Sequence, residues 1–310
     1  MQSIKVKVLT VFMSFMMAVS VLPALNSNAA VKKSWNNLGD GLKYELSDDG
    51  VLSVTGKGDM VDFVGTDTTG DGKADTSTAP WFDIRSQIKK IVIGDGITKV
   101  GNYAFIKCWN LAEIEFKSTG SLKTIGTQAF LWANSMKNNK LVIPSGVVTI
   151  GSNAFAWNCY ITSVSIPNTV KTIGYGAFSY CNALTSVYIP ASVTTIGGSA
   201  FRDCFYLKSV TGGAGLTSIE DSAFMYCSRM KTFKITSKKL AKLGKKCFYC
   251  CNALKTIYIK QTTKLKKKKV KKSLYFSSVK TVKVKKSKVK KYKKFFTYKN
   301  CGRRGVRVKK

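Results

Sequence analysis

The chain has 310 residues, with 51 lysines and arginines against 16 aspartates and glutamates and a formal net charge of +35. It contains no histidine, which excludes Ser-His-Asp and Cys-His catalytic arrangements and general acid–base catalysis by histidine. The remaining carboxylate pairs, Asp48-Asp49 and Glu220-Asp221, indicate no pocket. We therefore expect no catalytic residue, no cofactor and no enzymatic activity.

Residues 1–29 have the pattern of a signal peptide: two lysines, an apolar run from Val8 to Leu25, and a small-residue cleavage site that ends at Ala29. A membrane anchor is the alternative, but two serines and Pro23 interrupt the apolar run. No second apolar span follows, so the mature chain is expected to lack a transmembrane span. The predicted location is secreted, extracellular or associated with the cell surface.

Residues 30–80 are expected to form an N-terminal β cap. Residues 42–46 and 51–54 flank Asp48-Asp49-Gly50, which predicts a β-hairpin with an Asp-Gly turn. A repeat array needs such a cap, because its first coil otherwise exposes an apolar face.

An acidic loop lies within this cap. Asp67, Asp71 and Asp75 match positions 1, 5 and 9 of a calcium-binding loop, but Thr69 stands at position 3 and Thr78 replaces the bidentate glutamate. A solvated turn is the favoured interpretation, calcium binding is the weaker alternative, and no other metal site is expected.

Residues 81–286 carry an internal repeat with a period of about 23 residues. A small residue and a phenylalanine recur together, with an aliphatic residue five before the ring, glycine four before it except at Glu220, and an apolar residue (such as Met136) six after it. A fixed period of this length predicts a solenoid of stacked units, here about nine coils. The seven units with this pattern are those of Phe105, Phe130, Phe155, Phe178, Phe201, Phe224 and Phe248, and Phe82 stands 23 residues before Phe105.

Each unit is expected to contain a strand and two turns. Residues 186–189 alternate polar and apolar side chains, which predicts a strand with Val187 and Ile189 inward and Pro190 at its end. The recurring glycine indicates either positive φ or close packing of adjacent coils. The small-Phe pair is expected to begin a helical or 3-10 turn, and the strands to stack into one parallel sheet.

The consensus L-x-x-V-x-I-P-x-x-V-x-x-I-G-x-x-A-F-x-x-C closely resembles the BspA-like leucine-rich repeat family of bacterial surface proteins. The resemblance implies a right-handed leucine-rich-repeat solenoid of the α/β class, with a parallel β-sheet face, short helical or 3-10 turns and capping segments. It also implies a role in adhesion or partner binding. The family has a similar N-terminal segment that ends in a motif like Ala79-Pro80-Trp81-Phe82, so the array is expected to start near Trp81.

Five of the nine cysteines stand three residues after their phenylalanine, which predicts a stacked column of buried structural thiols rather than disulfides. Cys247 and Cys250 form a CxxC pair. With no second CxxC and no histidine, neither zinc binding nor redox chemistry is expected there. The column consists of Cys108, Cys181, Cys204, Cys227 and Cys251.

Charge divides the chain, because 31 of the 51 basic residues and none of the acidic residues follow Met230. Residues 287–310 are expected to form a lysine-rich cap with a short amphipathic helix that stops at Cys301-Gly302. The basic end should attract polyanions such as wall teichoic acid or sulfated glycans, and nucleic acid is not the expected partner. Lysine chosen for solubility is the equal alternative. The predicted polyanion-binding residues are Lys266, Lys267, Lys268, Lys269, Lys271 and Lys272.

Two columns are candidates for a binding surface. The outward strand position, which starts with Glu115 in the first coil, is the favoured site for a protein or glycan partner. The position two after each phenylalanine forms a second column, more often a packed shoulder. The rival hypothesis is a structural protein held on an anionic wall polymer by the lysine-rich end. The predicted ligand-binding residues are Ser165, Tyr188, Thr211, Lys234 and Tyr258, and the second column is Lys107, Trp132, Trp157, Tyr180, Asp203, Tyr226 and Cys250.

Overall fold

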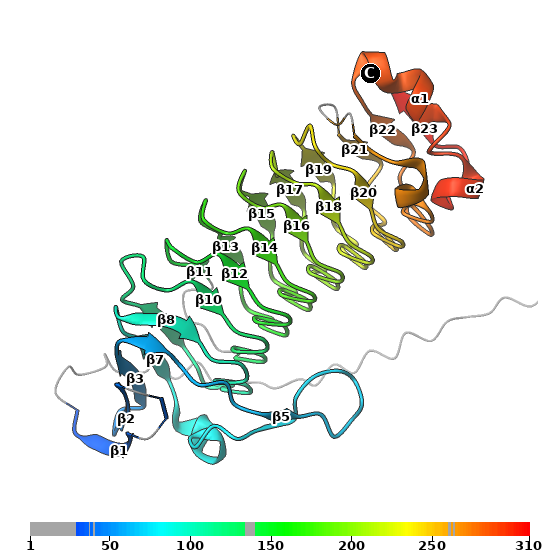
Figure 1. Ribbon diagram of the computed structural model, residues 1–310. Helices are drawn as coiled ribbons and strands as arrows, with labels where there is room; N and C mark the ends of the chain where they lie inside the picture. Colours follow the sequence, from blue (N-terminus) through cyan, green and yellow to red (C-terminus); the bar gives the residue numbers. More distant parts are fainter. Residues whose placement is uncertain (1–28, 37, 40, 134–139, 260–261, 263) are drawn as a thin grey trace, which may run out of the picture.

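The computed structural model describes residues 29–310 except 37, 40, 134–139, 260–261 and 263. The chain winds into a β-solenoid of about nine turns, stacked along one axis from the N-terminal hairpin to the C-terminal helices (Figure 1). The predicted signal peptide and the predicted core position Met136 lie outside the described residues. Within the described part, no helix has both the length and the apolar character needed to cross a membrane.

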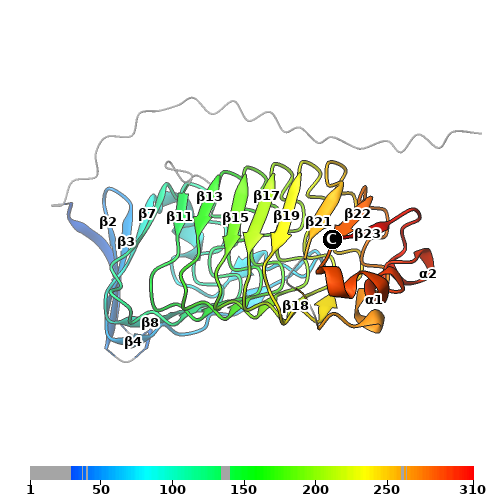
Figure 2. The same cartoon turned by 90° about the horizontal axis from the view of Figure 1, so that it is seen from above.

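One side of the solenoid is an eight-stranded sheet, which we call the wide sheet; its neighbouring strands all pair in parallel. Figure 2 shows these strands side by side along the array. The burial of β15 alternates outward and inward, which confirms that Val187 and Ile189 face the core. The strands are β11 (Lys140–Val142), β13 (Ser163–Ser165), β15 (Ser186–Ile189), β17 (Ser209–Gly212), β19 (Thr232–Ile235), β21 (Thr256–Tyr258), β22 (Thr281–Lys283) and β23 (Arg307–Lys309).

A second parallel sheet, the narrow sheet, was not predicted; the sequence suggested a single sheet. Most of its strands have two residues and come from the segment before the recurring glycine, where a polar residue faces out and an aliphatic residue faces in. One strand, Ile97–Val100, has four residues, and another, Gly58–Asp59, precedes the repeat. Its strands are β4 (Gly58–Asp59), β8 (Ile97–Val100), β10 (Thr124–Ile125), β12 (Thr149–Ile150), β14 (Thr172–Ile173), β16 (Thr195–Ile196), β18 (Ser218–Ile219) and β20 (Lys242–Leu243).

The third side of each coil, the turn side, holds the phenylalanine. The rings stack face to face through the core; Phe178 lies 5.7 Å from Phe155 and 5.4 Å from Phe201 between ring centroids. From Phe105 to Phe248 the backbone around each ring forms consecutive turns rather than the predicted helical or 3-10 turn. The reason is that the residues two before and two after each phenylalanine have positive φ, which reverses the helical sense.

The recurring glycine is explained by close packing and not by positive φ. A Cβ atom on Gly174 would lie 2.7 Å from the carbonyl carbon of Gly151, and one on Gly197 would lie 2.6 Å from that of Gly174. Each glycine therefore allows the backbones of adjacent coils to approach closely. Glu220 is the exception to this pattern, and its carboxylate is bound by Lys242 and Ser218.

The N-terminal end is closed by a separate five-stranded sheet in the order β1-β2-β3-β7-β9. The antiparallel pairing of β2 with β3 confirms the predicted hairpin. Trp81, not Phe82, begins the ring column, because its indole stacks on Phe105 at 5.7 Å and is fully buried. The strands of this sheet are β1 (Val31–Trp35), β2 (Leu42–Ser47), β3 (Val51–Gly56), β7 (Lys90–Ile93) and β9 (Glu113–Phe116). The same part of the chain contains a two-stranded sheet of β5 (Gly65–Thr66) and β6 (Thr76–Ser77), and the 3-10 helix η1 (Phe82–Gln87).

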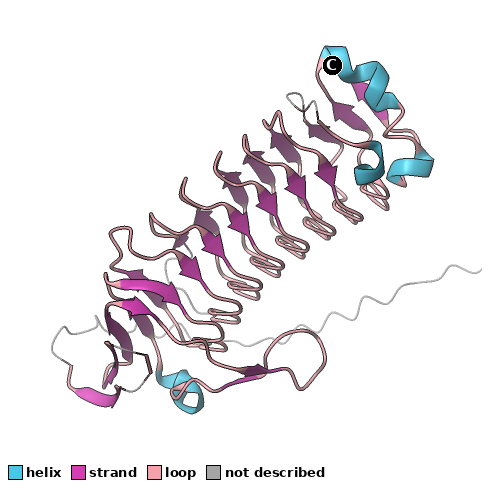
Figure 3. Ribbon diagram, in the orientation of Figure 1, coloured by secondary structure: helices cyan, strands magenta, loops and turns pink. Residues whose placement is uncertain are grey.

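The helices lie near the two ends of the array (Figure 3). The single helix expected over residues 287–300 is divided into two, and Gly302 ends the second with a left-handed φ of +76°, as predicted. Strand β23 was not predicted; it pairs with β22 and completes the wide sheet. The helices at this end are η2 (Lys267–Val270), η3 (Lys286–Lys288), α1 (Val289–Lys293) and α2 (Tyr298–Cys301).

Candidate functional site

The predicted ligand-binding residues lie together on the outward face of the wide sheet. Tyr188 is directly opposite Thr211, which is opposite Lys234, which is opposite Tyr258. Ser165, on β13, stands at the same outward position one strand earlier. In this part of the chain one coil is 23 to 24 residues long, the same as the sequence repeat. Equivalent residues of successive repeats therefore lie side by side in one straight row, which we call the outward row.

The outward row continues beyond the predicted residues. Tyr258 is opposite Lys283 and Lys283 is opposite Lys309, so the row becomes basic toward the C-terminal end. Sequence reasoning missed Lys309 because β23 follows two helices and lies outside the repeat period. Glu115, predicted as the acidic start of the row, belongs to β9 of the N-terminal sheet and is paired with Lys90 and Lys117.

Tyr188 is the most prominent apolar group on this face, with 63% of its surface exposed. Its ring lies over the next strand, since a Cβ atom on Gly212 would be 2.9 Å from the ring carbon Cε2. Serine and threonine hydroxyls form a parallel row two residues earlier on the strands from β13 to β22. The face thus offers an aromatic surface, hydroxyl groups and ammonium groups, which suit a protein or glycan surface.

The lysine-rich segment 266–272 is exposed except at Val270, which enters the core. The ion pairs recorded for the described residues include none of its six lysines. Backbone hydrogen bonds fix the segment, as Lys266 donates to the carbonyl of Ala241 and Lys272 to that of Asn300. The lysines therefore project from an ordered backbone and form a positively charged edge.

A second basic feature, the basic cleft, has a volume of about 640 Å³. Strand β23 and helix α2 create it, so sequence reasoning had no signal for it beyond the excess of positive charge. Arg304 packs against the ring of Tyr298, with its guanidinium carbon 5.0 Å from the ring centroid. The cationic residues that line the cleft are Lys293, Arg303, Arg304, Arg307 and Lys309.

The second predicted column lies on the turn side, and all seven of its residues have φ between +55° and +63°. The N–H of each residue donates to a carbonyl of the next coil, as from Trp157 to Ser179 at 2.8 Å, which compensates the disfavoured conformation. Trp157 stacks on Tyr180 at 3.9 Å and contacts Trp132 edge to face at 5.3 Å. These rings are half-buried, so this part of the column is a packed shoulder.

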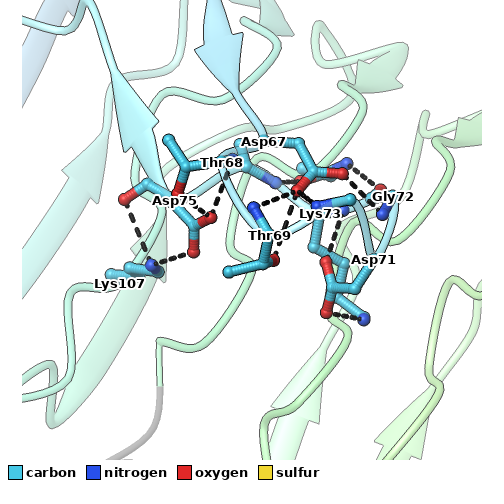
Figure 4. A network of polar contacts seen from close by, with 11 residues as sticks. Asp67, Thr68, Thr69, Asp71, Gly72, Lys73, Asp75 and Lys107 are labelled. Carbon is cyan, nitrogen blue, oxygen red and sulfur yellow. Dashed lines mark hydrogen bonds and ion pairs between the residues drawn. The ribbon is translucent and has the colours of Figure 1, made fainter.

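The acidic loop 67–75 contacts the start of this column, where Asp75 meets Lys107 (Figure 4). Gln128, a buried residue of the turn side, accepts a hydrogen bond from Ala74 N–H at 2.8 Å and donates one to the carbonyl of Gly72 at 3.2 Å. Lys107 pairs with Asp75 at 2.9 Å between Nζ and Oδ1. The loop is thereby attached to the solenoid at three points.

The three aspartates of the loop have different partners. Asp67 accepts hydrogen bonds from the N–H groups of Thr69, Gly70 and Gly72, and Asp71 pairs with Lys73. Within the described residues, no three carboxylates, thiols or imidazoles are grouped as metal ligands. Calcium binding by Asp67, Asp71 and Asp75 stays a prediction, and their observed role is to shape and attach the loop.

All nine cysteines lie in the described part of the chain and are thiols rather than disulfides. Seven are buried, including the whole predicted column, which confirms its structural character. Burial raises the pKa of Cys108 to about 12 and raises the pKa of Cys247 in the CxxC pair. A reactive cysteine requires a lowered pKa, so this environment favours inert thiols.

Comparison with known proteins identifies the repeat. The model of the family described as "BspA type Leucine rich repeat region", in six copies, matches residues 81–205 and 171–301. A search of curated proteins found no match.

Several solved structures are similar. A leucine-rich repeat protein of Treponema pallidum is 24% identical, over 69% of this chain and 88% of its own, with a TM-score of 0.40. A leucine-rich cell surface protein of Faecalibacterium prausnitzii is 17% identical, over 90% and 94%, with a TM-score of 0.36. A leucine-rich repeat protein of Eubacterium ventriosum is 20% identical, over 80% and 96%, with a TM-score of 0.34.

Proposed function

The chain belongs to the BspA-type leucine-rich repeat family, and we propose that it is a secreted or cell-surface bacterial scaffold that binds an extracellular protein or glycan. The binding face is the outward row of the wide sheet with its neighbouring hydroxyl row. The scaffold is non-catalytic in this proposal, in keeping with a repeat fold and a chain without histidine. The surface location rests on the family resemblance and on the signal-peptide pattern of residues 1–29.

The observation that carries the proposal is the exposed ring of Tyr188 near the middle of the outward row, whose residues are held opposite one another by the pairing of the strands. Aromatic residues are enriched at interfaces, and a few of them provide most of the binding energy. Thr211, Lys234 and Tyr258 follow on adjacent strands, so a rigid ligand would meet all four without any change in the backbone. Pre-organisation of this kind reduces the entropic cost of binding.

The test is an array of glycans and extracellular proteins probed with residues 30–310, followed by titration of each hit. Tyr188→Ala should weaken a sheet-face ligand by about thirty-fold, or about 2 kcal/mol, as expected for a central aromatic. Phe276→Ala is the matched control, because Phe276 is equally exposed, at 63%, but lies on the turn side and lines neither the outward row nor a cleft used in binding. Ligands that bind Tyr188→Ala as tightly as the unmodified chain would refute the assignment of this face.

A second candidate function is attachment to an anionic wall polymer. It is favoured by the basic cleft and by the absence of any acidic residue after Met230 in the sequence. Guanidinium groups bind phosphate and carboxylate groups in a bidentate manner, so the arginines of the cleft suit such a polymer better than isolated lysines do.

This candidate is tested by retention on immobilised teichoic acid. A truncation at Met230 is unsuitable, since it removes β19 and exposes the buried side chains of Phe224 and Met230. Charge substitutions replace it: Arg303→Gln, Arg304→Gln and Arg307→Gln in one variant, and all six lysines of segment 266–272 to Gln in another. Attachment predicts retention that is lost at roughly 1 M salt, where the Debye length is about 3 Å. Unchanged retention of both variants would exclude it.

A further inference from the structure

A small cleft of about 290 Å³ lies on the turn side, between the tip of the 67–75 loop and the middle coils. Asp71, Gly72 and Lys73 form one wall, and Tyr175 and Arg202 lie on the coil side. Ligand pockets usually start at roughly 300 Å³, so this cleft is of the size that holds one small group. It lies apart from the wide sheet, so a ligand bound here would be independent of the outward row.

One coil carries glycine beside the cleft where the other coils carry a side chain. The residue two before each phenylalanine has positive φ in every coil from Phe105 to Phe248, and Gly176, with φ +58°, is the one glycine among the seven. A Cβ atom there would lie 2.0 Å from Oδ1 of Asn153, so the glycine makes room for the Asn153 amide that lines the cleft. The other residues at this position are Tyr103, Gln128, Asn153, Ser199, Ser222 and Lys246.

The same position explains why the loop tip stays over the cleft. Gln128, two coils before Gly176, holds the loop backbone through its side-chain amide. The neighbouring Asn153 lines the cleft, and Gly176 makes room for its amide. The turn side therefore changes along three successive coils from loop attachment to the wall of the cleft.

Aromatic rings form part of the cleft. Tyr180 lines it and stacks on Trp157 at 3.9 Å with an interplanar angle of 7°, which fixes both rings. Tyr175 is 57% exposed, and its ring extends over Gly198, whose Cβ position would be 3.1 Å from the ring carbon Cδ2. The indole Nε1 of Trp157 is buried without a hydrogen-bond partner in the structure. An apolar ring face bordered by polar groups is the usual arrangement of a small-molecule site.

The charges of the cleft are balanced. Lys73 pairs with Asp71, and Arg202 pairs with Asp203 at 2.9 Å between Nε and Oδ2. A carboxylate in an ion pair can still accept hydrogen bonds, and a paired guanidinium group can still donate them. Asp71 and Arg202 can therefore bind neighbouring hydroxyl groups of a ligand. The buried hydroxyls of Ser179 and Ser199 add to this set. An anionic ligand would meet Asp71 as well as the cations, whereas a neutral polyol finds both donors and acceptors.

We infer that this cleft binds a single neutral pyranose residue, most simply the terminal sugar of a glycan, with its apolar C–H face on Tyr175 and its hydroxyls between Asp71 and Arg202. The size of the cleft limits the site to one ring. The chemistry is that of hydroxyl recognition without net charge, which distinguishes it from the basic C-terminal end.

The test is saturation-transfer NMR, followed by titration, of residues 30–310 with methyl glycosides of glucose, galactose, mannose and N-acetylglucosamine, and with glucuronic acid as the anionic comparison. At least one neutral glycoside should bind, and Gly176→Asn should reduce its affinity at least tenfold, because a side chain there would displace the Asn153 amide that lines the cleft. Asparagine is chosen because it tolerates positive φ. Tyr175→Ala should cause a similar loss, whereas Phe276→Ala, at an exposed ring of the turn side that does not line the cleft, should leave the affinity unchanged.

Absence of binding by every neutral glycoside overturns the inference, as does tighter binding of glucuronic acid. Unchanged affinity in Tyr175→Ala also overturns it, and this variant keeps the test decisive if Gly176→Asn does not fold. Loss of sugar binding in Tyr188→Ala but not in Tyr175→Ala would place the sugar on the wide sheet. That result would support the proposed function and reject this site.

Discussion

The thiol of Cys204 donates a hydrogen bond to the backbone carbonyl of Phe178, 3.1 Å away in the preceding coil. Cys227 makes the same contact with Phe201 at 3.1 Å, and Cys251 with Phe224 at 3.0 Å. Asn158 stands at the same position in its own coil and donates from Nδ2 to the carbonyl of Phe130 at 2.7 Å. In these four coils the position three after the phenylalanine is thus a buried donor that joins coils, which explains why cysteine and asparagine both fit there, whereas Ala133, at this position after Phe130, fills it without a side-chain donor.

The first prediction concerns thiol reactivity. Burial raises the pKa of each cysteine in the buried column, so the thiolate that reacts with disulfide reagents is scarce at neutral pH. In the native chain only Cys159 and Cys250, which are half-buried, should react readily with a chromogenic disulfide reagent. The other seven should react after denaturation. Rapid reaction of more than two thiols in the folded protein would contradict the buried column.

The second prediction concerns the ring column. Phe178→Ala removes a fully buried ring that stacks between Phe155 and Phe201, and it should lower the free energy of unfolding by about 3–5 kcal/mol. Urea unfolding measures the change. Tyr188→Ala, which removes an exposed ring, should change it by no more than about 0.5 kcal/mol. A loss below about 1 kcal/mol for Phe178→Ala would show that the ring is not a core element.

The third prediction concerns the attachment of the 67–75 loop. Gln128→Ala removes both hydrogen bonds between its side chain and the loop backbone, leaving Ala74 N–H without a partner. Loss of a buried partner costs about 1–3 kcal/mol, so hydrogen exchange in the loop should accelerate by about tenfold or more. Ser222→Ala is the matched control, because Ser222 has the same positive φ four coils further along. Equal exchange rates in the two variants would mean that Gln128 does not hold the loop.

The fourth prediction is that acid releases the loop. The hydroxyl of Thr68 and the ammonium of Lys107 hold the pKa of Asp75 well below its usual 3.8. Desolvation raises the pKa of Asp67, but hydrogen bonds from backbone N–H groups, foremost Gly72, outweigh it and lower the pKa. A lowered pKa in the folded state gives stability that is fully present above the usual value and lost as the pH falls through the folded value. Docking should therefore be constant near neutrality and weaken between about pH 5 and pH 1.

Tryptophan fluorescence follows this release, because Lys73 of the loop lies 5.7 Å from the ring centroid of Trp157. Asp75→Asn should remove part of the pH dependence while leaving the acid response of the distant coils unchanged. A fluorescence transition of the same size and midpoint in Asp75→Asn would contradict the assignment to this carboxylate.

Most of the structure of one coil can be predicted from the sequence, because the residues that specify its strand and its buried side chains lie close together in the chain. Val187 and Ile189 alternate with polar neighbours, Pro190 ends their strand, and Phe178 recurs as Phe201. Each unit can bury these side chains only against its neighbours, so the period predicted the solenoid, the buried rings and the outward row containing Tyr188. Because the sequence repeat has the same length as one coil, the residues of the outward row lie on adjacent strands.

Other features depend on contacts between segments that the period does not relate. Whether the recurring glycine serves positive φ or close packing was decided by the distance between coils, as at Gly174. The docking of the loop on Gln128 joins residues 54 apart, and the pairing of β23 with β22 crosses two helices. The small cleft at Gly176 needs both the loop and the coil.

The sequence by itself determined the period, the inward and outward positions and the charge of each end, since these depend on residue type and spacing along one coil. Only the tertiary structure decided the second sheet, the turn geometry and the position of Lys309 in the outward row. It also decided the cleft beside Gly176. The physical reason is that hydrophobic periodicity specifies which face of a segment is buried, whereas the neighbour that covers it is selected by long-range packing and hydrogen bonding.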